Sequence, residues 1–248
     1  RDPGRSGGAG GVCGGAEMNG GLLNFEALVC GYGDTMVLRG LSGSAGPGRV
    51  LGVLGRNGVG KTTLMRALAG FLPLREGTMT LGGHDLSQVA PHQRLARGMA
   101  YAPQEDVVFG DLSVQENLWL HLDDRDPQRY AACLQAFPRL GERMAQRAGS
   151  LSGGERKLLS FTRTMGLRAA LSLLDEPTEG VQPENIERMA ALLRARKAEG
   201  AGFVIVEQNL EFLLAVADDL MAIDHGECLL KGAASEFGRA ALEAHLMV

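Results

Sequence analysis

The stretch from residue 50 to residue 72 constrains the fold more than any other part of the chain. A short apolar run at residues 50–54 leads directly into a glycine-rich segment, and residues 63–72 have a helical pattern. Such a run is typical of a buried strand in an α/β layer arrangement. The segment in between fits the pattern G-x-x-x-x-G-K-[ST] and consists of Gly55, Arg56, Asn57, Gly58, Val59, Gly60, Lys61 and Thr62. The sequence therefore predicts a strand, a phosphate-binding loop and a helix in this order.

This loop predicts contacts with nucleotide phosphates. Backbone N–H groups of the loop and of Thr63, together with the positive end of the helix, can surround phosphate oxygens. We expect Lys61 to reach the β- and γ-phosphates. We expect the Thr62 hydroxyl to take a position at Mg²⁺, because a hard cation prefers oxygen ligands. The alternative is a glycine-rich turn in which Gly-Lys-Thr occurs by chance.

An acidic pair follows the apolar run at residues 171–174. Asp175 and Glu176 are thereby placed at the C-terminal edge of a predicted strand, where open α/β sheets bind ligands. The alternative is an exposed acidic pair that merely ends a strand.

Ser152, Gly153 and Gly154 precede a predicted helix at residues 155–166. Their hydroxyl and backbone amides can present donors to an anion. The plain structural alternative is that Ser152 only caps the helix, and the two roles are compatible.

The order of these motifs resembles the ATP-binding-cassette (ABC) family. The phosphate loop is followed by Leu-Ser-Gly-Gly at residues 151–154 and by Leu-Leu-Asp-Glu-Pro at residues 173–177. The resemblance implies an α/β P-loop ATPase core with an antiparallel β subdomain and a helical signature subdomain. It also implies ATP and Mg²⁺ as cofactors. In this family two cassettes face head to tail, and the 151–154 segment of one covers the ATP held by the P-loop of the other.

The resemblance also assigns roles to single residues. Asp175 would organise Mg²⁺, and Glu176 would be the general base that positions and polarises the attacking water. Gln104, which follows Tyr-Ala-Pro, would touch Mg²⁺ or water, and Tyr32 would stack on adenine with its flat apolar ring. Without the resemblance, Gln104 is an ordinary loop residue and Tyr32 a core or turn tyrosine.

Patterning divides the chain into one ATPase domain at residues 18–248 and a preceding segment at residues 1–17. That segment is mostly glycine without an apolar stretch, and we expect a disordered tail or a cloning remnant, with Met18 as the natural start. Within the domain we expect antiparallel strands at residues 22–41 and 77–81 and a helical subdomain at about 105–165. Further predictions are a capping box at 113–116, helices at 184–199 and 210–217, a strand at 203–206 and a hairpin turn at 225–226.

Composition excludes several function classes. The 248 residues carry a formal net charge of -4, so no basic field indicates nucleic acid as a partner. We find no run of about 18 apolar residues that would span a bilayer. The four cysteines have neither C-x-x-C spacing nor histidine partners, which argues against a metal site and a disulfide framework and predicts isolated thiols in a reducing cytosol; they are Cys13, Cys30, Cys133 and Cys228.

The chain departs from the general ABC pattern in three places. Gln208 stands where the pattern has a histidine that contacts the γ-phosphate. An amide can hydrogen-bond to phosphate but cannot take a charge near neutral pH, so we expect catalysis to lean harder on Glu176. The loop at residues 177–183 lacks the usual aspartate, and residues 155–157 are Glu-Arg-Lys where glutamines are usual.

These departures resemble one branch of the family: the cassettes of bacterial importers for branched-chain amino acids, urea and related amides. The shared segments are Val-Glu-Gln-Asn at 206–209, Phe-Pro-Arg-Leu at 137–140 and Thr-Glu-Gly-Val-Gln-Pro at 178–183, the last being most similar to the urea-type members. The resemblance implies a peripheral ATPase subunit on the cytoplasmic face of the inner membrane. Its partners would be permease subunits, a second identical or homologous cassette and, indirectly, a periplasmic solute-binding protein.

Two other function classes stay open at this point. One is a non-transport ABC switch acting on ribosomes or DNA, although such proteins typically carry two cassettes or a long coiled-coil insertion. The other is a P-loop phosphotransferase acting on a small molecule, for which the Leu-Ser-Gly-Gly-Glu segment would be coincidental.

Overall fold

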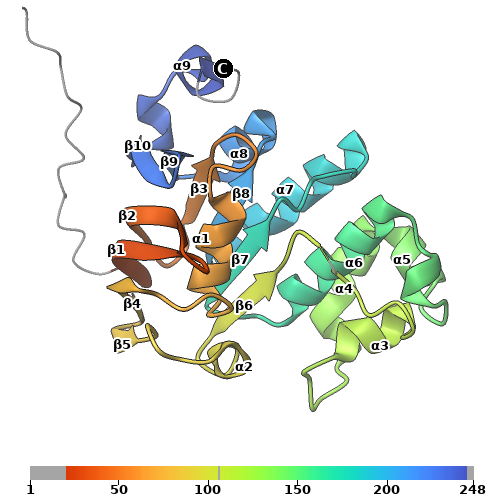
Figure 1. Cartoon of the computed structure of the whole chain (residues 1–248). Coiled ribbons are helices and arrows are strands. Elements are labelled where there is room, and N and C mark those ends of the chain that lie inside the picture. The colour runs from red at the N-terminus through yellow and green to blue at the C-terminus, as the bar shows by residue number, and fades with distance from the viewer. Residues whose placement is uncertain (1–20, 106, 245–248) are drawn as a thin grey trace, which may run out of the picture.

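The computed structural model describes residues 21–105 and 107–244, and its sheets and helices are drawn in Figure 1. The predictions for residues 1–17 and for Met18 concern residues outside this part. Within it, the α/β architecture predicted from the strand, loop and helix pattern is confirmed.

The larger sheet has six strands in the order β10-β9-β3-β8-β7-β6. Their bounds are β3 (Val50–Leu54), β6 (Met99–Ala102), β7 (Leu171–Asp175), β8 (Gly202–Glu207), β9 (Asp219–Asp224) and β10 (Glu227–Ala233). Pairing is parallel throughout from β9 to β6, and β10 pairs antiparallel with β9 at the sheet edge. The predicted hairpin between β9 and β10 is confirmed. Its turn residues His225 and Gly226 have φ of +45° and +79°, the left-handed conformation that a tight two-residue hairpin needs.

The central parallel strands are buried on both faces because each contributes side chains to two cores. In β3, Val50 and Leu54 belong to one cluster, whereas Leu51 and Val53 belong to the other. This alternation follows from the two-residue period of a strand. Apolar residues therefore fill the strands, and the charged residues of β7 and β8 lie at the C-terminal ends.

The smaller sheet is the predicted antiparallel subdomain. Its strands run in the order β2-β1-β4-β5, with bounds β1 (Leu23–Tyr32), β2 (Thr35–Ala45), β4 (Glu76–Leu81) and β5 (His84–Asp85). Helix α1 (Lys61–Leu68) lies between the two sheets and contributes Leu64 and Met65 to the cluster shared with both.

The helical subdomain lies between β6 and β7 (Figure 1). Two of its helices begin with capping boxes, at Ser113 and Glu116 and at Ser152 and Glu155, which confirms both predicted caps. The elements are α3 (Val114–Trp119), η1 (Pro127–Tyr130), α4 (Ala131–Ala136), α5 (Pro138–Glu142), η2 (Ala148–Ser150) and α6 (Gly153–Gly166). The remaining elements are α2 (Pro91–Arg94), α7 (Pro183–Ala198), α8 (Leu210–Val216), η3 (Ala234–Glu236) and α9 (Arg239–Ala244).

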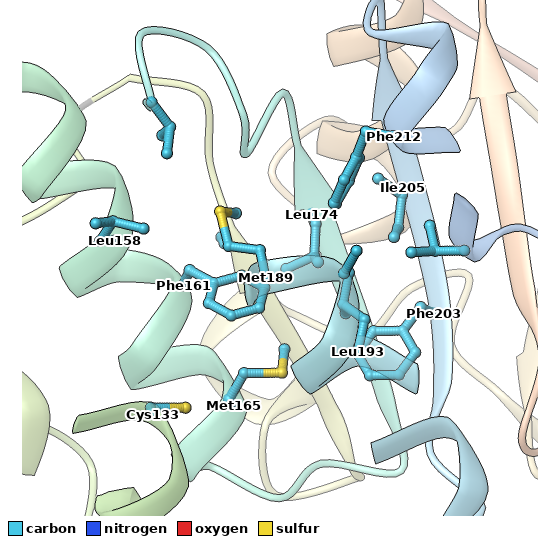
Figure 2. Close-up of a cluster of buried hydrophobic side chains, with 14 of the residues drawn as sticks. Cys133, Leu158, Phe161, Met165, Leu174, Met189, Leu193, Phe203, Ile205 and Phe212 are labelled. Carbon is cyan, nitrogen blue, oxygen red and sulfur yellow. The ribbon is translucent and has the colours of Figure 1, made fainter. Parts of the chain in front are cut away.

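One continuous apolar cluster joins the helical subdomain to the central sheet. Figure 2 shows Phe161 and Met165 of α6 facing Met189 of α7 and Leu174 of β7, all of them buried. The position of α6, and of the residues that it carries toward the edge of the sheet, is therefore fixed by core packing.

We predict that Gly166→Ala destabilises the protein although alanine is the better helix former. A Cβ at Gly166 would lie 1.9 Å from a ring carbon of Tyr130, which is 1% exposed and donates its hydroxyl to the Leu118 carbonyl. Overpacking of this kind costs about 1–3 kcal/mol, whereas the helix preference returns at most about 1 kcal/mol. The urea unfolding midpoint should fall.

Gly141→Ala is the matched control, since a Cβ there meets nothing within 4 Å in helix α5. It should leave the midpoint unchanged or raise it. An equal response of both variants would contradict the predicted clash.

Candidate functional site

The predicted phosphate loop connects β3 to α1. The helix begins at Lys61, and Gly60 before it has φ of +113°, a conformation that favours glycine. The helix ends at Leu68 rather than at the predicted residue 72, because Gly70 with φ of +82° turns the chain away. The N-terminal amides of α1 thus point toward the end of the loop, as the sequence predicts.

Lys61 is held inside this loop. Its Nζ donates to the carbonyls of Gly55 and Arg56, both at 2.9 Å, and lies 3.3 Å from Oε1 of Glu176. Its side chain is 4% exposed. The ammonium therefore lies between the loop and the acidic end of β7.

A cavity of about 150 Å³ collects most of the predicted P-loop residues together with Gln104 and Glu176. Its lining comprises Asn57, Gly58, Gly60, Lys61, Thr62, Thr63, Gln104 and Glu176. Residues more than 100 positions apart in the sequence thus meet at one edge of the central sheet.

The three predicted Mg²⁺ ligands converge beside this cavity. The Thr62 hydroxyl lies 3.3 Å from Oε1 of Gln104 and 3.4 Å from Oδ1 of Asp175. A hydroxyl has one proton and cannot donate to both oxygens at once. Asp175 is 1% exposed, and apart from Thr62 it accepts only from the Tyr101 hydroxyl, at 3.3 Å, among the described residues. The site thus offers three oxygen ligands, from Thr62, Gln104 and the buried Asp175 carboxylate, which has no ion-pair partner among the described residues. Such a set fits a hard divalent cation that keeps some of its waters.

The Asp175 carboxylate is destabilised in the metal-free protein. Burial first, and the neighbouring charge of Glu176 second, raise its pKa from 3.8 to about 6. A raised carboxyl pKa favours folding below the unfolded value of 3.8, and that contribution is lost as the pH rises through about 6.

We therefore predict that Asp175→Asn stabilises the metal-free protein in EDTA. The gain should grow from about pH 4.5 to about pH 7.5, where it approaches roughly 3 kcal/mol, since one pKa unit corresponds to about 1.4 kcal/mol. Urea unfolding at both pH values measures it. Asp123→Asn, at an exposed position, is the control and should show no such gain. A gain that does not depend on pH would contradict the assigned cause.

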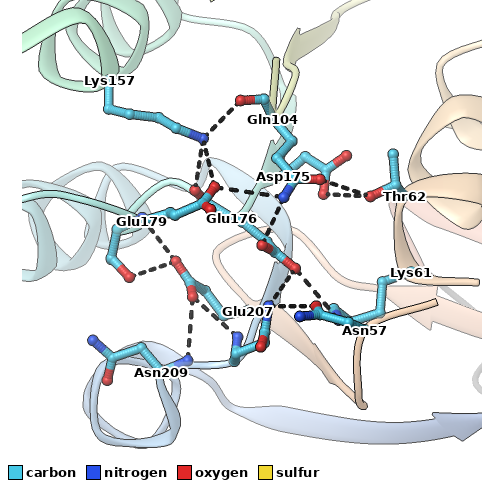
Figure 3. A network of polar contacts seen from close by, with 12 residues as sticks. Asn57, Lys61, Thr62, Gln104, Lys157, Asp175, Glu176, Glu179, Glu207 and Asn209 are labelled. Atoms are coloured by element: carbon cyan, nitrogen blue, oxygen red, sulfur yellow. Dashed lines mark hydrogen bonds and ion pairs between the residues drawn. The ribbon is translucent and has the colours of Figure 1, made fainter. Parts of the chain in front are cut away.

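Glu176 is buried and tightly held. Its backbone φ of +45° lies in the left-handed region, and its carboxylate accepts hydrogen bonds from Nε2 of Gln104 at 2.9 Å and from Nε2 of Gln208 at 3.0 Å. Gln208 also donates to Oδ1 of Asn57 in the phosphate loop, at 2.7 Å. Figure 3 shows these contacts. The other three residues that the sequence predicts to be catalytic therefore all contact Glu176; they are Lys61, Gln104 and Gln208.

Two further residues of this network, Glu207 and Lys157, were not predicted. Glu207, 3% exposed, accepts from N–H and the hydroxyl of Thr178 and from N–H of Gln208 and Asn209 (Figure 3). Burial raises the pKa of this carboxyl. Lys157 of α6 donates to the carbonyls of Gln104 and Glu176. A signal for Glu207 was available, because it ends an apolar run just as Asp175 does.

The Leu-Ser-Gly-Gly segment at residues 151–154, whose members are called the signature residues below, lies apart from the phosphate loop of its own chain. The Ser152 hydroxyl accepts from N–H of Glu155 at 3.3 Å, and Ser152 and Gly153 are exposed. Ser152 and Gly154 line a separate cavity of about 560 Å³ with residues of α5 and α7, and no P-loop residue lines it.

Tyr32 ends β1 and is 45% exposed, and Nη1 of Arg66 lies 3.4 Å from its hydroxyl. The alternative of a core tyrosine is therefore wrong, whereas a turn tyrosine and a ring that stacks on adenine both stay open.

Comparison with known proteins decides the family. The profile of the ABC transporter family matches residues 38–179. This chain belongs to the ABC transporter family. It is 32% identical over 220 residues to the probable branched-chain amino acid transport ATP-binding protein LivF of Archaeoglobus fulgidus, covering 87% of this chain and 93% of the relative.

Two further relatives have similar coverage. Identity is 31% over 213 residues to the high-affinity branched-chain amino acid transport ATP-binding protein BraG of Pseudomonas aeruginosa, with 84% of this chain and 91% of the relative covered. It is 30% over 223 residues to the lipopolysaccharide export system ATP-binding protein LptB of Escherichia coli K12, with 86% and 91% covered.

The fold is shared with solved structures. One, described as the ATP-binding subunit of an ABC transporter, has a TM-score of 0.78 at 24% identity and covers 87% of this chain and 91% of that chain. The predicted ABC ATPase fold is thus confirmed. The chain is an ABC transporter ATPase that binds ATP and associates with transporter permease components. The phosphotransferase alternative is wrong. Within residues 21–105 and 107–244, each helix is too short or too polar to span a bilayer.

Proposed function

We infer that this ABC ATPase energises the import of branched-chain amino acids or urea. The observation that carries this proposal is the match to LivF and BraG over more than four fifths of the chain and more than nine tenths of each relative. The Val-Glu-Gln-Asn and Thr-Glu-Gly-Val-Gln-Pro segments, which resemble importers of amides and especially of urea, support it. Solute specificity would lie in a periplasmic binding protein and in the permease.

The site supports hydrolysis by an in-line water. Loop amides and Lys61 would hold the ATP phosphates, and the Tyr32 ring would stack on adenine. Glu176 would orient the attacking water and take up its proton, while the Gln104 and Gln208 amides keep the carboxylate in place at 2.9 and 3.0 Å. Mg²⁺, held by Thr62, Gln104 and Asp175, would neutralise charge on the phosphates.

The permease would dock beside Gln104 on the helical subdomain. Two phenylalanines near Gln104 are exposed, Phe71 by 61% and Phe109 by 55%. The Phe71 ring packs against Tyr101, with ring centroids 5.9 Å apart, and Tyr101 precedes Gln104 by three residues. Exposed aromatic rings of this kind are enriched at interfaces. A permease bound here would place the cassette on the cytoplasmic face of the membrane.

Within the membrane complex we propose a head-to-tail dimer with a second cassette. The exposed Ser152 and Gly153 and their separation from the P-loop of the same chain support it. The partner would be a second copy or a homologous subunit.

Uptake measurements test this function. A strain without the gene should lose uptake of radiolabelled leucine or urea and regain it with the wild-type gene but not with Lys61→Met. Unchanged uptake of both solutes would contradict the proposal. Because LptB is almost as similar as BraG, export is the second candidate. Accumulation of envelope lipid inside the mutant strain, without an uptake defect, would favour it.

A further inference from the structure

Lys157 links α6, the helix that begins at the signature residues, to the hydrolytic site of its own chain. It lies on α6 with its side chain 11% exposed. Its Nζ donates to the carbonyl of Gln104 at 2.8 Å and to the carbonyl of Glu176 at 3.1 Å, and it lies 3.6 Å from Oε2 of Glu179 (Figure 3). Two of the three N–H donors of the ammonium are thus used by backbone carbonyls, and the Glu179 carboxylate forms an ion pair with the same group.

The two carbonyls belong to the two residues whose side chains meet in the site. Nε2 of Gln104 donates to Oε2 of Glu176 at 2.9 Å. One cation thus fixes the backbones of both partners in this contact, 72 residues apart in the sequence. If that cation were lost, the side-chain hydrogen bonds between the two loops would be those that the Gln104 amide donates to Glu176 and Glu179.

The backbone of Glu176 needs such a restraint. Its φ of +45° lies in the left-handed region, which is unfavourable for a residue with a side chain. The amide of Glu176 donates to the Val206 carbonyl at 2.9 Å, and its carbonyl accepts from Lys157. The peptide groups on both sides of the strained residue are therefore held, which fixes the direction of its carboxylate.

The same helix carries Ser152, Gly153 and Gly154 at its N-terminal end, shortly before Lys157. Ser152 caps α6, and Lys157 lies five positions further, a separation of about 7.5 Å along a helix axis. A small displacement of the α6 N-terminus would carry Lys157 with it and would change its hydrogen bonds to both loop carbonyls.

We propose that Lys157 is a positioning residue through which α6 aligns Gln104 and Glu176. It couples the signature end, which covers the partner's ATP, to the hydrolytic site of the same subunit. The proposal rests on the head-to-tail dimer proposed above. In this role Lys157 affects the turnover rate and the cooperativity between the two sites, and it does not affect the binding of ATP.

The test compares Lys157→Met and Lys157→Arg with Lys231→Met, a charge loss at an exposed position on β10. In Lys157→Met we expect kcat for ATP hydrolysis to fall about tenfold or more, as small misplacements of catalytic groups do. The KM for ATP and the melting temperature should stay near wild type, and the Hill coefficient should fall toward unity. Arg, which keeps the charge and several donors, should restore part of kcat, and Lys231→Met should behave as wild type.

A kcat within twofold of wild type in Lys157→Met would overturn the proposal. So would a loss of kcat accompanied by an equal rise in KM or by a lower melting temperature, since either indicates a merely structural role. The dimer is tested separately by ATP-dependent dimerisation of Glu176→Gln with and without Lys157→Met. Absence of dimers in both proteins counts against the head-to-tail arrangement, whereas their loss only with Lys157→Met overturns the role assigned to Lys157.

Discussion

Glu176→Gln is expected to lower the steady-state ATPase rate at least about 100-fold, because a positioned general base contributes about 10²- to 10⁴-fold. Among the described residues, the groups that touch this carboxylate are the Lys61 ammonium and the amides of Gln104 and Gln208. None of the three can accept a proton near neutral pH. The histidine that the general pattern would place at position 208 is absent from this chain, so no imidazole replaces the lost base there.

ATP binding should persist in this variant. Glutamine has the same shape as glutamate, and one of the two contacting amides can rotate to pair with it. Lys61 keeps its two loop carbonyls at 2.9 Å. Phosphate release measures turnover, and titration calorimetry with ATP measures binding. The control is Glu187→Gln, an exposed position on α7, which should hydrolyse ATP normally. Hydrolysis by Glu176→Gln within tenfold of wild type would exclude Glu176 as the base.

The parts of the site that could be predicted from sequence are those fixed by local pattern. The apolar run before Gly55 and the one before Asp175 each identify a buried strand, and residues at the end of a parallel strand lie at the ligand edge of the sheet. Asp175 and Glu176 were found in this way. Glu207 carries the same signal, because it also ends an apolar run.

The contacts within the site could not be predicted, because they depend on strand order. Gln104 follows β6 and Gln208 follows β8, and both reach Glu176 only because β7 lies between these strands. Lys157 is a further step removed. Its contacts require that α6 pack on the sheet with one particular face inward, which is decided by buried residues such as Phe161. In the sequence it was visible only as an unusual lysine after Leu-Ser-Gly-Gly-Glu-Arg.

Gly153→Asp is expected to abolish hydrolysis without affecting the fold of the single chain. A Cβ at Gly153 meets nothing within 4 Å, and the position is exposed in the first turn of α6. An acidic residue there is favourable for the isolated helix, by up to about 1 kcal/mol. In a head-to-tail dimer, however, the new carboxylate would face the partner's ATP phosphates. Like charges brought together at an interface cost several kcal/mol, so we expect an ATPase loss of about 100-fold or more.

Melting temperature and ATP affinity of the Gly153→Asp monomer should match wild type, and Gly153→Ala, which adds volume but no charge, should retain much more activity. Weaker ATP binding by the monomer would contradict a site that acts on another chain. It would place residues 151–154 beside the P-loop of their own subunit, against the separate cavities of the structure.

Mixing two inactive proteins makes this test decisive for a dimer of identical chains. In a mixed dimer of Lys61→Met and Gly153→Asp, one site combines the intact P-loop of the second protein with the intact signature of the first, and the other site carries both defects. Half of the dimers are mixed at equal concentrations and each has one intact site, so activity should rise from the background of the two proteins to at most about a quarter of wild type, and to less than that because the sites cooperate. If each site were built from one chain, both sites of every dimer would stay defective, and the mixture would be no more active than the two proteins alone.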